Sequence, residues 1–308
     1  MIKPGTLQKD DLIAVAAPAS PFARAEFVFA VKKLRALGFK VTFRKDIFAK
    51  DRYLAGTDER RADEINSFFA ESAVKAICFA RGGYGTQRIL PLLDIETIKA
   101  NPKIVFGYSD ITALHIYLYH HGIGGSFYGP TIARHLKHAP QKTIDILFGL
   151  LSSASPAGRL PVNGAKAFKK GTAEGTLIGG CLSLVTTSIG TPYELPTDDA
   201  ILFLEDVGEP VYVYDRMLTH LKAAGLLRNV KGIVFGTLGL KLNKNEKTAW
   251  LKKTLDTTLG DFPGPIVTNF PTGHLDLKSL FVTLPLGVKA RLRTEPLELE
   301  IVESALSF

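Results

Sequence analysis

The first half of the chain alternates short apolar runs with amphipathic stretches, and this alternation limits its fold more than any other feature. Residues 12–17 (LIAVAA) are an apolar run closed by Pro18, which favours a buried strand. Residues 22–37 follow with apolar side chains at helical spacing, and Gly38 marks the end of that helix. The pattern continues with expected strands at 39–43, 76–80 and 104–106, and expected helices at 57–70 (with Thr57 as N-cap) and about 111–121. This order predicts an α/β fold with a mainly parallel sheet flanked by helices.

Two glycine-containing turns come directly after neighbouring expected strands, at 81–85 (RGGYG) and 107–110 (GYSD). Carboxyl ends of parallel strands meet at one edge of a sheet, where ligands bind in such folds, so we expect a site there. The first turn matches neither the dinucleotide-binding nor the P-loop glycine spacing. An oxyanion hole, an anion cradle and a plain tight turn all remain open for it.

The second half of the chain has a different organisation. Small and turn-forming residues predict a linker at 161–172, between an N-terminal domain (1–160) and a C-terminal domain (173–308). Beyond it we expect strands at 200–204, 232–235, 281–284 and 297–302, and helices at about 182–189 and 211–224. Closely spaced turns in the last third predict a smaller, strand-rich α+β domain with an antiparallel component.

The net charge of +8 invites a nucleic-acid partner, but the basic residues are scattered and lack interleaved aromatic residues. We therefore expect no nucleic-acid partner, although a positive field favours an anionic substrate. Cys78 and Cys181 lie in apolar stretches and resemble buried hydrophobic residues more than a disulfide or metal site. No run reaches the roughly 18 apolar residues of a membrane span, and the N-terminus makes a poor signal peptide. These features predict a cytoplasmic protein with no membrane partner.

Ser109 is the leading candidate for chemistry, because it lies where a buried strand turns into a helix. A serine there projects its hydroxyl at the open edge of the sheet, beside the backbone N–H groups of the new helix. The sequence G-Y-S-D lacks the second glycine of the common G-x-S-x-G motif. A plain helix N-cap is the alternative interpretation of this serine.

A nucleophilic serine needs a base, and the base needs a group that orients it. Of the seven histidines, His274 stands apart because it lies in a turn between two apolar runs. Glu205 and Asp206 end an expected strand, where a carboxylate either reaches a site or is simply solvated. Spacing alone does not pair Glu205 with His274.

Six motifs in order resemble those of the LD-carboxypeptidase family of serine peptidases. They are VAAPAS (15–20), ARGGYG (80–85), GYSD (107–110), GGCLSLV (179–185), LEDVGE (204–209) and PTGH (271–274). The resemblance covers almost the whole chain. It implies a Ser-Glu-His triad, with Ser109 as nucleophile, His274 as general base and acid, and Glu205 holding the imidazole. It also implies a nucleophile on the N-terminal domain, with Glu205 and His274 on the C-terminal one.

The same resemblance extends to the surroundings of the nucleophile. It implies an oxyanion hole made by the backbone N–H of Asp110 and one from the Gly82-Gly83 turn. Arg81 and Tyr84, on that turn, are candidate substrate-binding residues, since an exopeptidase must hold a terminal carboxylate. Neither a metal nor an organic cofactor is expected.

The implied activity is release of the terminal D-Ala from murein tetrapeptide, a small peptide substrate, during cytoplasmic cell-wall recycling. A related branch instead cleaves peptide–nucleotide antibiotics of the microcin type, and it remains the alternative. The segment 190–200 is short and lacks Trp, which favours the murein branch, whereas Cys181 replaces an Asn common in the family. A homodimer is a further expectation from the resemblance. A non-enzymatic binding protein, with Ser109 only capping a helix, is the third hypothesis.

Overall fold

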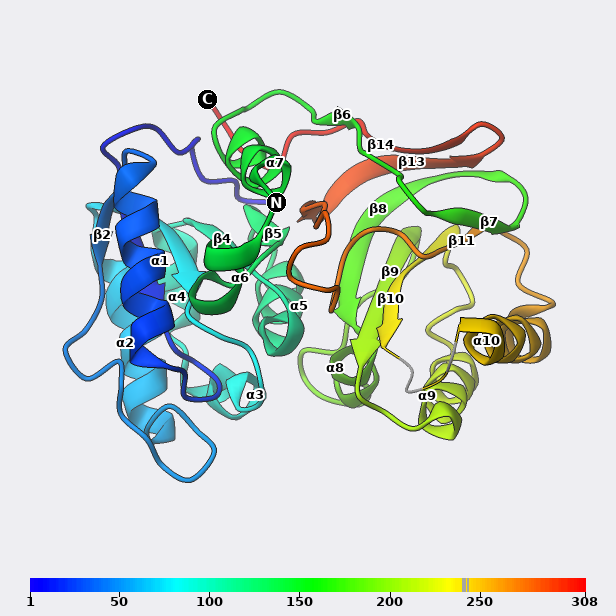
Figure 1. Ribbon diagram of the computed structural model, residues 1–308, viewed down its shortest axis with the longest axis horizontal. Helices are drawn as coiled ribbons and strands as arrows, with labels where there is room; N and C mark the ends of the chain where they lie inside the picture. The colour runs from blue at the N-terminus through cyan, green and yellow to red at the C-terminus, as the bar shows by residue number, and fades with distance from the viewer. Residues whose placement is uncertain (240–241, 243) are drawn as a thin grey trace.

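The computed structural model describes residues 1–239, 242 and 244–308, and it places them in two halves that are each built on a β-sheet (Figure 1). The first sheet has the strand order β12-β5-β4-β3-β1-β2. The second has the order β6-β14-β13-β8-β9-β10-β11-β7.

The sheet of the N-terminal half is mainly parallel, as predicted. Its strands are β1 (Leu12–Ala16), β2 (Lys40–Thr42), β3 (Val74–Phe79), β4 (Ile104–Gly107), β5 (Ser126–Tyr128) and β12 (Leu284–Leu286). Strands β1 to β5 pair in parallel, and only β12 runs antiparallel, beside β5. The carboxyl ends of β3 and β4, which are neighbours, therefore bring the two glycine-containing turns to the same edge.

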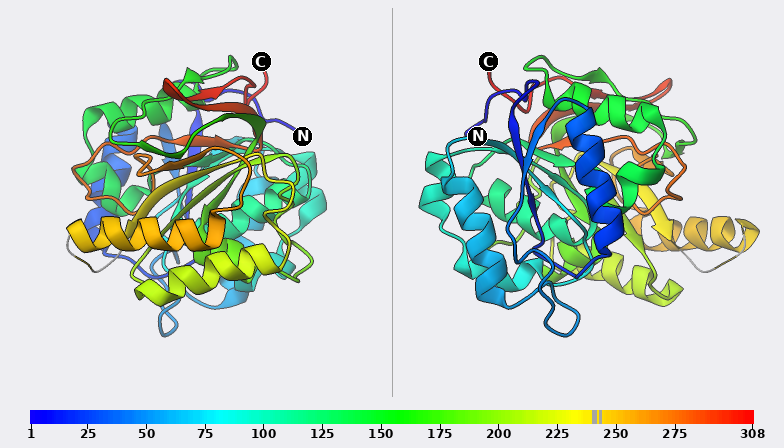
Figure 2. Two further views of the ribbon diagram at one scale, coloured as in Figure 1. Left: turned by 90° about the vertical axis from the view of Figure 1, so that its right-hand side faces the viewer. Right: turned by 60° about the vertical axis from the view of Figure 1, so that its left-hand side comes forward.

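Helices cover both faces of this sheet. They are α1 (Arg24–Ala36), α2 (Asp58–Ala70), α3 (Thr86–Ile89), η1 (Leu90–Leu92), α4 (Ile95–Ala100), η2 (Ser109–Ile111), α5 (Thr112–His120), α6 (Ile132–His138) and α7 (Gln141–Leu151). Successive residues of β1 point to opposite faces, so Ile13 and Val15 join the core under α1, whereas Ala14 and Ala16 join the core under α2. Figure 2 (right) shows α1 and α2 on opposite sides of the strands.

Local signals set the ends of these helices. The Thr57 hydroxyl accepts a hydrogen bond from the backbone N–H of Arg60, so Thr57 is the predicted N-cap of α2. Gly38 has a φ of +96° directly after the last turn of α1, a conformation that favours glycine and ends the helix.

The sheet of the C-terminal half is mixed. Its strands are β6 (Gly158–Arg159), β7 (Lys166–Lys169), β8 (Thr172–Cys181), β9 (Ala200–Val207), β10 (Gly232–Gly239), β11 (Ile266–Thr268), β13 (Val288–Thr294) and β14 (Leu297–Ile301). Strands β8 to β11 pair in parallel, and the outer strands are antiparallel to their neighbours. The helices are α8 (Leu182–Thr187), α9 (Val211–Ala223) and α10 (Lys244–Leu259). In Figure 2 (left), α9 and α10 lie side by side over the sheet.

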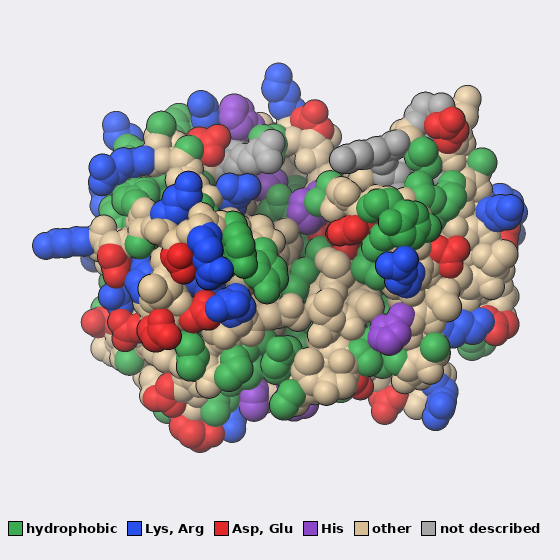
Figure 3. Space-filling view, turned by 90° about the horizontal axis from the view of Figure 1, so that it is seen from below, with side chains coloured by type: hydrophobic (Ala, Val, Ile, Leu, Met, Phe, Trp, Pro, Cys, Tyr) green, Lys and Arg blue, Asp and Glu red, His purple; other side chains and the backbone are tan. Residues whose placement is uncertain are grey.

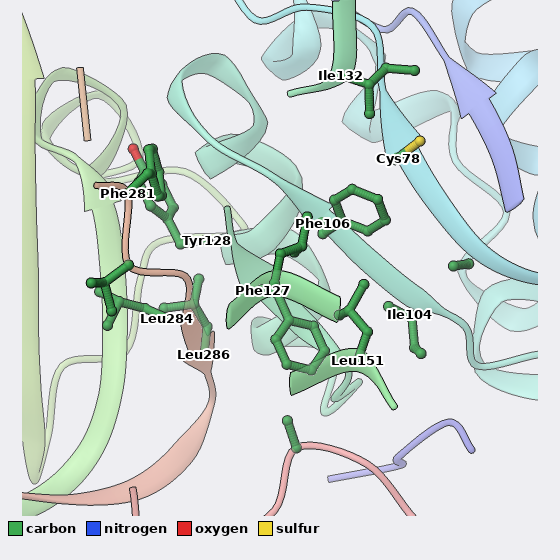
Figure 4. Packing of buried hydrophobic residues seen from close by; sticks show 14 of the residues in the cluster. Cys78, Ile104, Phe106, Phe127, Tyr128, Ile132, Leu151, Phe281, Leu284 and Leu286 are labelled. Atoms are coloured by element: carbon green, nitrogen blue, oxygen red, sulfur yellow. The ribbon is translucent and has the colours of Figure 1, made fainter. Parts of the chain in front are cut away.

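Two segments differ from the sequence-based expectations. The segment 161–172, expected as a linker, contains β7, which pairs with the edge strand β11. The expected strand at 281–284 begins only at Leu284 and extends the sheet of the N-terminal half, where Leu284 pairs with Tyr128. Figure 4 shows Leu284 and Leu286 packed between the two halves, close to Phe127 and Tyr128. The C-terminal chain thus crosses back and ties the halves together.

The surface shows no single dominant charge on the face seen in Figure 3, where Lys and Arg side chains lie on both halves among Asp and Glu. This agrees with the scattered basic residues of the sequence. Among the described residues, no helix combines the length and the apolar character that a membrane crossing requires.

Candidate active site

Ser109 lies in the turn that joins β4 to α5, two residues after the end of the strand. Its backbone has a φ of +65°, a left-handed conformation that costs a non-glycine residue about 1–3 kcal/mol and is found preferentially at functional sites. The helical turn η2 begins at Ser109, and its N-cap, Tyr108, has no side-chain cap bond. The N-cap interpretation of Ser109 is therefore wrong: the serine hydroxyl makes a different contact.

That contact is the first of two hydrogen bonds that join three side chains in a row. Ser109 Oγ is 3.0 Å from His274 Nε2, and His274 Nδ1 is 2.9 Å from Glu205 Oε2. The carboxylate also accepts the backbone N–H of His274 at 3.0 Å. This is the contact order that a nucleophile, a base and an orienting acid require. The serine comes from the N-terminal sheet, whereas Glu205 lies on β9 and His274 follows β11.

The environment of His274 favours a basic imidazole. Burial of the ring lowers the pKa of His274, but the charge of Glu205 and its hydrogen bond raise the pKa by more. The net pKa of His274 lies above the ordinary value of 6.5. Glu205 itself is completely buried, so its carboxylate acts on the imidazole through little intervening water.

Backbone packs closely around Glu205, and glycine makes this possible. Gly273, the residue before the histidine, has a φ of +113°. A Cβ atom at that position would lie 2.4 Å from Glu205 Oε2, well inside contact distance. Glycine in the P-T-G-H motif therefore both forms the turn and leaves room for the carboxylate.

The glycine-rich turn after β3 lies directly against Ser109. A Cβ atom on Gly82 would lie 2.9 Å from Ser109 Cβ and 3.1 Å from Ser109 Oγ. Ser20 holds this turn, because its backbone N–H donates to Gly82 O at 3.3 Å and its Oγ accepts the N–H of Tyr84 at 3.2 Å. Backbone at Gly82 and Gly83 is thus beside the serine, the place where an oxyanion hole is needed.

Asp110 has a structural contact in addition to its expected backbone role. Its side chain is buried and accepts the backbone N–H of Thr86 at 2.8 Å, which fastens η2 to the first residue of α3. Burial raises the pKa of the Asp110 carboxyl. The two turns around Ser109 are therefore tied to each other.

A cavity of about 350 Å³ opens at Ser109. Beyond the predicted Arg81, Gly82, Gly83, Ser109 and His274, its walls include Tyr108, Thr131, His135, Cys181, Ser183, Leu184, Asp206, Val207 and Glu209. A second cavity of about 470 Å³, reaching to His138 and Lys278, shares Tyr108, Val207 and His274 with it. Space for a substrate thus extends to both sides of the histidine.

The two candidate substrate-binding residues have different positions. Arg81 lines the cavity, and its Nη1 donates to Pro21 O at 2.9 Å. Tyr84 instead lies on the surface, 47% exposed, with its ring 5.9 Å from that of Tyr53, and it is not among the described residues that line the cavity.

The cavity wall also contains an acidic and a thiol group, from Asp206 and Cys181. The sequence left open whether the carboxylate of Asp206 reaches a site or is solvated. Asp206 is buried, and its carboxylate accepts the backbone N–H groups of Ser183 and Val207, each at 2.7 Å. Cys181 is buried as predicted, but it also lines the cavity, with Sγ 3.3 Å from Ser183 Oγ. Burial, followed by the charges of Glu205 and Asp206, raises the pKa of the Cys181 thiol well above its usual range. This thiol is therefore a poor competing nucleophile.

The described part of the chain holds no group of three or more His, Cys, Asp or Glu side chains that could bind a metal ion. Of the other histidines, His115 is fully buried and its Nε2 lies 2.9 Å from Gly107 O, at the end of β4. Burial lowers the pKa of His115 to about 4, so its ring is neutral and supports the strand end.

Comparisons with known proteins find matches for both halves of the chain. Residues 13–129 match the LD-carboxypeptidase N-terminal domain and residues 174–292 match the LD-carboxypeptidase C-terminal domain. A protein of Bacillus subtilis (strain 168) named "Probable murein peptide carboxypeptidase" is 34% identical over 316 residues, which cover 99% of this chain and 95% of that protein.

Two kinds of solved structure resemble the fold. The microcin C7 self-immunity protein MccF, in complex with aspartyl sulfamoyl adenosine, superposes with a TM-score of 0.88 at 26% identity, over 100% of both chains. The muramoyltetrapeptide carboxypeptidase from Oxalobacter formigenes superposes with a TM-score of 0.81 at 28% identity, over 94% of this chain and 97% of that one.

Proposed function

We propose that this chain, which belongs to the LD-carboxypeptidase family and is a serine-type LD-carboxypeptidase, releases the terminal D-Ala from murein tetrapeptide in cell-wall recycling. The observation that carries the proposal is the hydrogen-bonded row Ser109, His274 and Glu205, whose first two members line a cavity of about 350 Å³. The sequence relative named for murein peptides favours this substrate.

In the proposed mechanism, His274 Nε2 takes the proton of Ser109 as Oγ attacks the carbonyl carbon of the scissile amide. The negative charge on the former carbonyl oxygen is stabilised by backbone N–H groups of Asp110 and the Gly82-Gly83 turn. His274 then gives its proton to the leaving D-Ala nitrogen, and water hydrolyses the acyl-enzyme in the same way. Glu205 holds the imidazole in the tautomer that accepts at Nε2 and stabilises the imidazolium.

A second candidate function rests on the higher TM-score of MccF, which is 0.88 against 0.81 for the murein enzyme. In that case the same row of side chains would cleave the acyl linkage of an aminoacyl sulfamoyl nucleotide. Both functions use identical chemistry, so the walls of the cavity, and not the triad, decide between them. The cytoplasmic location and the homodimer stay predictions.

Substrate choice is testable with three compounds given to the purified enzyme. We expect D-Ala release from L-Ala-γ-D-Glu-meso-diaminopimelyl-D-Ala, and no release from the matched peptide that ends in L-Ala, because the D-centre places its methyl group on the opposite side of the backbone. We expect little cleavage of aspartyl sulfamoyl adenosine. Cleavage of the nucleotide compound alone would replace the murein proposal with the microcin one.

Arg81 is expected to bind the terminal carboxylate of the substrate, since it is the cationic side chain beside Gly82 in the cavity wall. A charged hydrogen bond of this kind is worth about 1.5–3 kcal/mol, so Arg81→Ala should lower kcat/KM roughly 10- to 100-fold, mainly through KM. The check is the ratio of kcat/KM for the free acid and the C-terminal amide of one peptide.

That ratio should fall toward unity in Arg81→Ala. Arg24→Ala, which removes an arginine stacked on Phe48 and outside the cavity, should keep the wild-type ratio. An unchanged kcat/KM in Arg81→Ala would count against a carboxylate-binding role.

A further inference from the structure

Tyr128, the last residue of β5, contacts both ends of the catalytic row, the hydrogen-bonded side chains of Ser109, His274 and Glu205. Tyr128 is not a member of the predicted triad. Its hydroxyl is 2.5 Å from Glu205 Oε1 and 3.2 Å from the backbone nitrogen of Ser109. The side chain is completely buried. One hydroxyl thus connects the nucleophile turn of the N-terminal sheet with the acid on β9 of the C-terminal sheet.

The direction of both hydrogen bonds follows from the groups involved. The backbone N–H of Ser109 can only donate, so the Tyr128 oxygen accepts that bond. Glu205 accepts two N–H groups of His274 at its other oxygen, so the single proton of the Tyr128 hydroxyl points to Oε1. Burial, followed by the charge of Glu205, raises the pKa of Tyr128 well above its usual range, which keeps that proton on the phenol.

Packing leaves the ring of Tyr128 little freedom. Its centroid is 5.2 Å from that of Phe203 and 6.1 Å from that of Tyr108. At Gly180 a Cβ atom would lie 3.0 Å from Tyr128 Cε2, so the backbone of β8 also borders the ring. Figure 4 shows the side chain leaving β5 toward the strands of the C-terminal sheet, whereas Phe127 points elsewhere. The hydroxyl is therefore placed by the two sheets themselves.

We propose that Tyr128 is a positioning residue that sets the geometry and the charge of the Glu205–His274 pair and holds the Ser109 turn in register with it. The inference rests on the proposed Ser-His-Glu mechanism. By donating to Oε1, the phenol fixes the carboxylate so that Oε2 faces His274, and it withdraws part of the negative charge from the imidazole. By accepting the Ser109 N–H, it supports the left-handed backbone of the nucleophile.

The second contact has a consequence for the oxyanion hole. Because the N–H of Ser109 donates to Tyr128, this N–H is directed away from the reacting carbonyl. Stabilisation of the oxyanion then falls to the backbone of Asp110 and of the Gly82-Gly83 turn, which lies against Ser109.

Tyr128→Phe removes only the hydroxyl and tests the proposal. We expect kcat to fall roughly 10- to 100-fold with KM unchanged, since a hydrogen bond to a charged group and one to the nucleophile turn are lost. Without the phenol, the charge of Glu205 acts more strongly on His274 and raises its pKa. The acid limb of the pH profile should therefore move to higher pH, which a purely packing role would not cause.

Two controls separate this effect from other failures. Tyr117→Phe removes a hydroxyl from a ring that packs on His121 and Tyr193, and it should leave kcat and the acid limb unchanged. The pH dependence of Ser109 phosphorylation by diisopropyl fluorophosphate, which releases fluoride, reports on Ser109, His274 and Glu205 without any peptide substrate. A shifted labelling profile in Tyr128→Phe would thus support the inference even if murein tetrapeptide proved to be the wrong substrate.

If Tyr128→Phe does not fold, 2,3-difluorotyrosine at position 128 keeps the hydroxyl and makes it a stronger donor. The acid limb should then move to lower pH. Wild-type kcat with an unmoved acid limb in Tyr128→Phe, or an unmoved limb in the difluorotyrosine enzyme, would overturn the proposal.

Discussion

Ser109→Ala is expected to abolish D-Ala release, with kcat lowered about 10⁴- to 10⁶-fold, while the fold and substrate binding persist. Loss of the nucleophile in a serine hydrolase leaves only the contribution of the oxyanion donors and of substrate binding. The gap left by Oγ is small and borders an open cavity, so little packing is lost. Alanine at this left-handed position also has no more backbone strain than Ser109 already has.

The measurement is single-turnover release of D-Ala, followed together with the melting temperature and the Kd for the tetrapeptide. Ser152→Ala is the matched control, since its Oγ caps the end of α7 by donating to Phe148 O at 2.7 Å and to Gly149 O at 3.4 Å. It should retain wild-type kcat. Release by Ser109→Ala above about 1% of wild type would place the nucleophile elsewhere, because loss of the true nucleophile leaves far less activity than that.

Sequence patterns could predict those features of the site that depend only on local secondary structure. Ser109 follows a buried strand and precedes a helix, and that position alone predicted a hydroxyl at the open edge of the sheet. Thr57 likewise caps the helix that its position predicted. Such features depend on a few neighbouring residues, so they are visible in a short window of sequence.

The partners of Ser109 are a different case, because 165 residues separate it from His274 and 69 separate Glu205 from His274. No periodicity brings such residues together, and only the resemblance to a family predicted that they meet. The sequence patterns also did not predict the strand pairing that joins the two halves. Leu284 pairs with Tyr128 because the C-terminal chain returns to the first sheet, which no local pattern in 281–284 indicates.

The proposed role of Tyr128 could not be predicted from the sequence. This residue lies at the end of the short strand β5 and is completely buried, like many core aromatic residues. Its role depends on which carboxylate the second sheet brings to its hydroxyl. The same holds for Gly82 and Gly273. A Cβ atom on Gly82 would collide with Ser109, and a Cβ atom on Gly273 would collide with Glu205, which only the folded structure reveals.

Glu205→Gln is expected to lower kcat about 10⁴-fold, as for loss of the acid in other serine triads. The amide cannot satisfy its surroundings in either orientation. If its NH₂ faces His274, the ring must accept at Nδ1 and carry its proton on Nε2, where it can no longer accept from Ser109. If its NH₂ faces Tyr128, the phenol proton loses its acceptor.

The pH profile gives this variant a signature of its own. In the wild type the neutral imidazole, which is the base, predominates only above a pKa that Glu205 raises beyond 6.5. Removing the carboxylate removes its charge and its charged hydrogen bond, whereas burial of the ring remains and lowers the pKa of His274. The acid limb of kcat/KM should therefore move to lower pH even as the plateau falls, opposite to the shift expected for Tyr128→Phe.

The profile would be recorded from about pH 5 to about pH 9, the range in which an imidazole titrates. Glu174→Gln makes the same change at the exposed end of β8, beside Arg291, and should leave both plateau and limb at their wild-type values. A Glu205→Gln enzyme within tenfold of the wild-type plateau would show that the carboxylate does not orient His274. A lowered plateau with an unmoved acid limb would show that Glu205 orients the imidazole of His274 without raising the pKa of His274. The proposed stabilisation of the imidazolium by the charge of Glu205 would then be wrong.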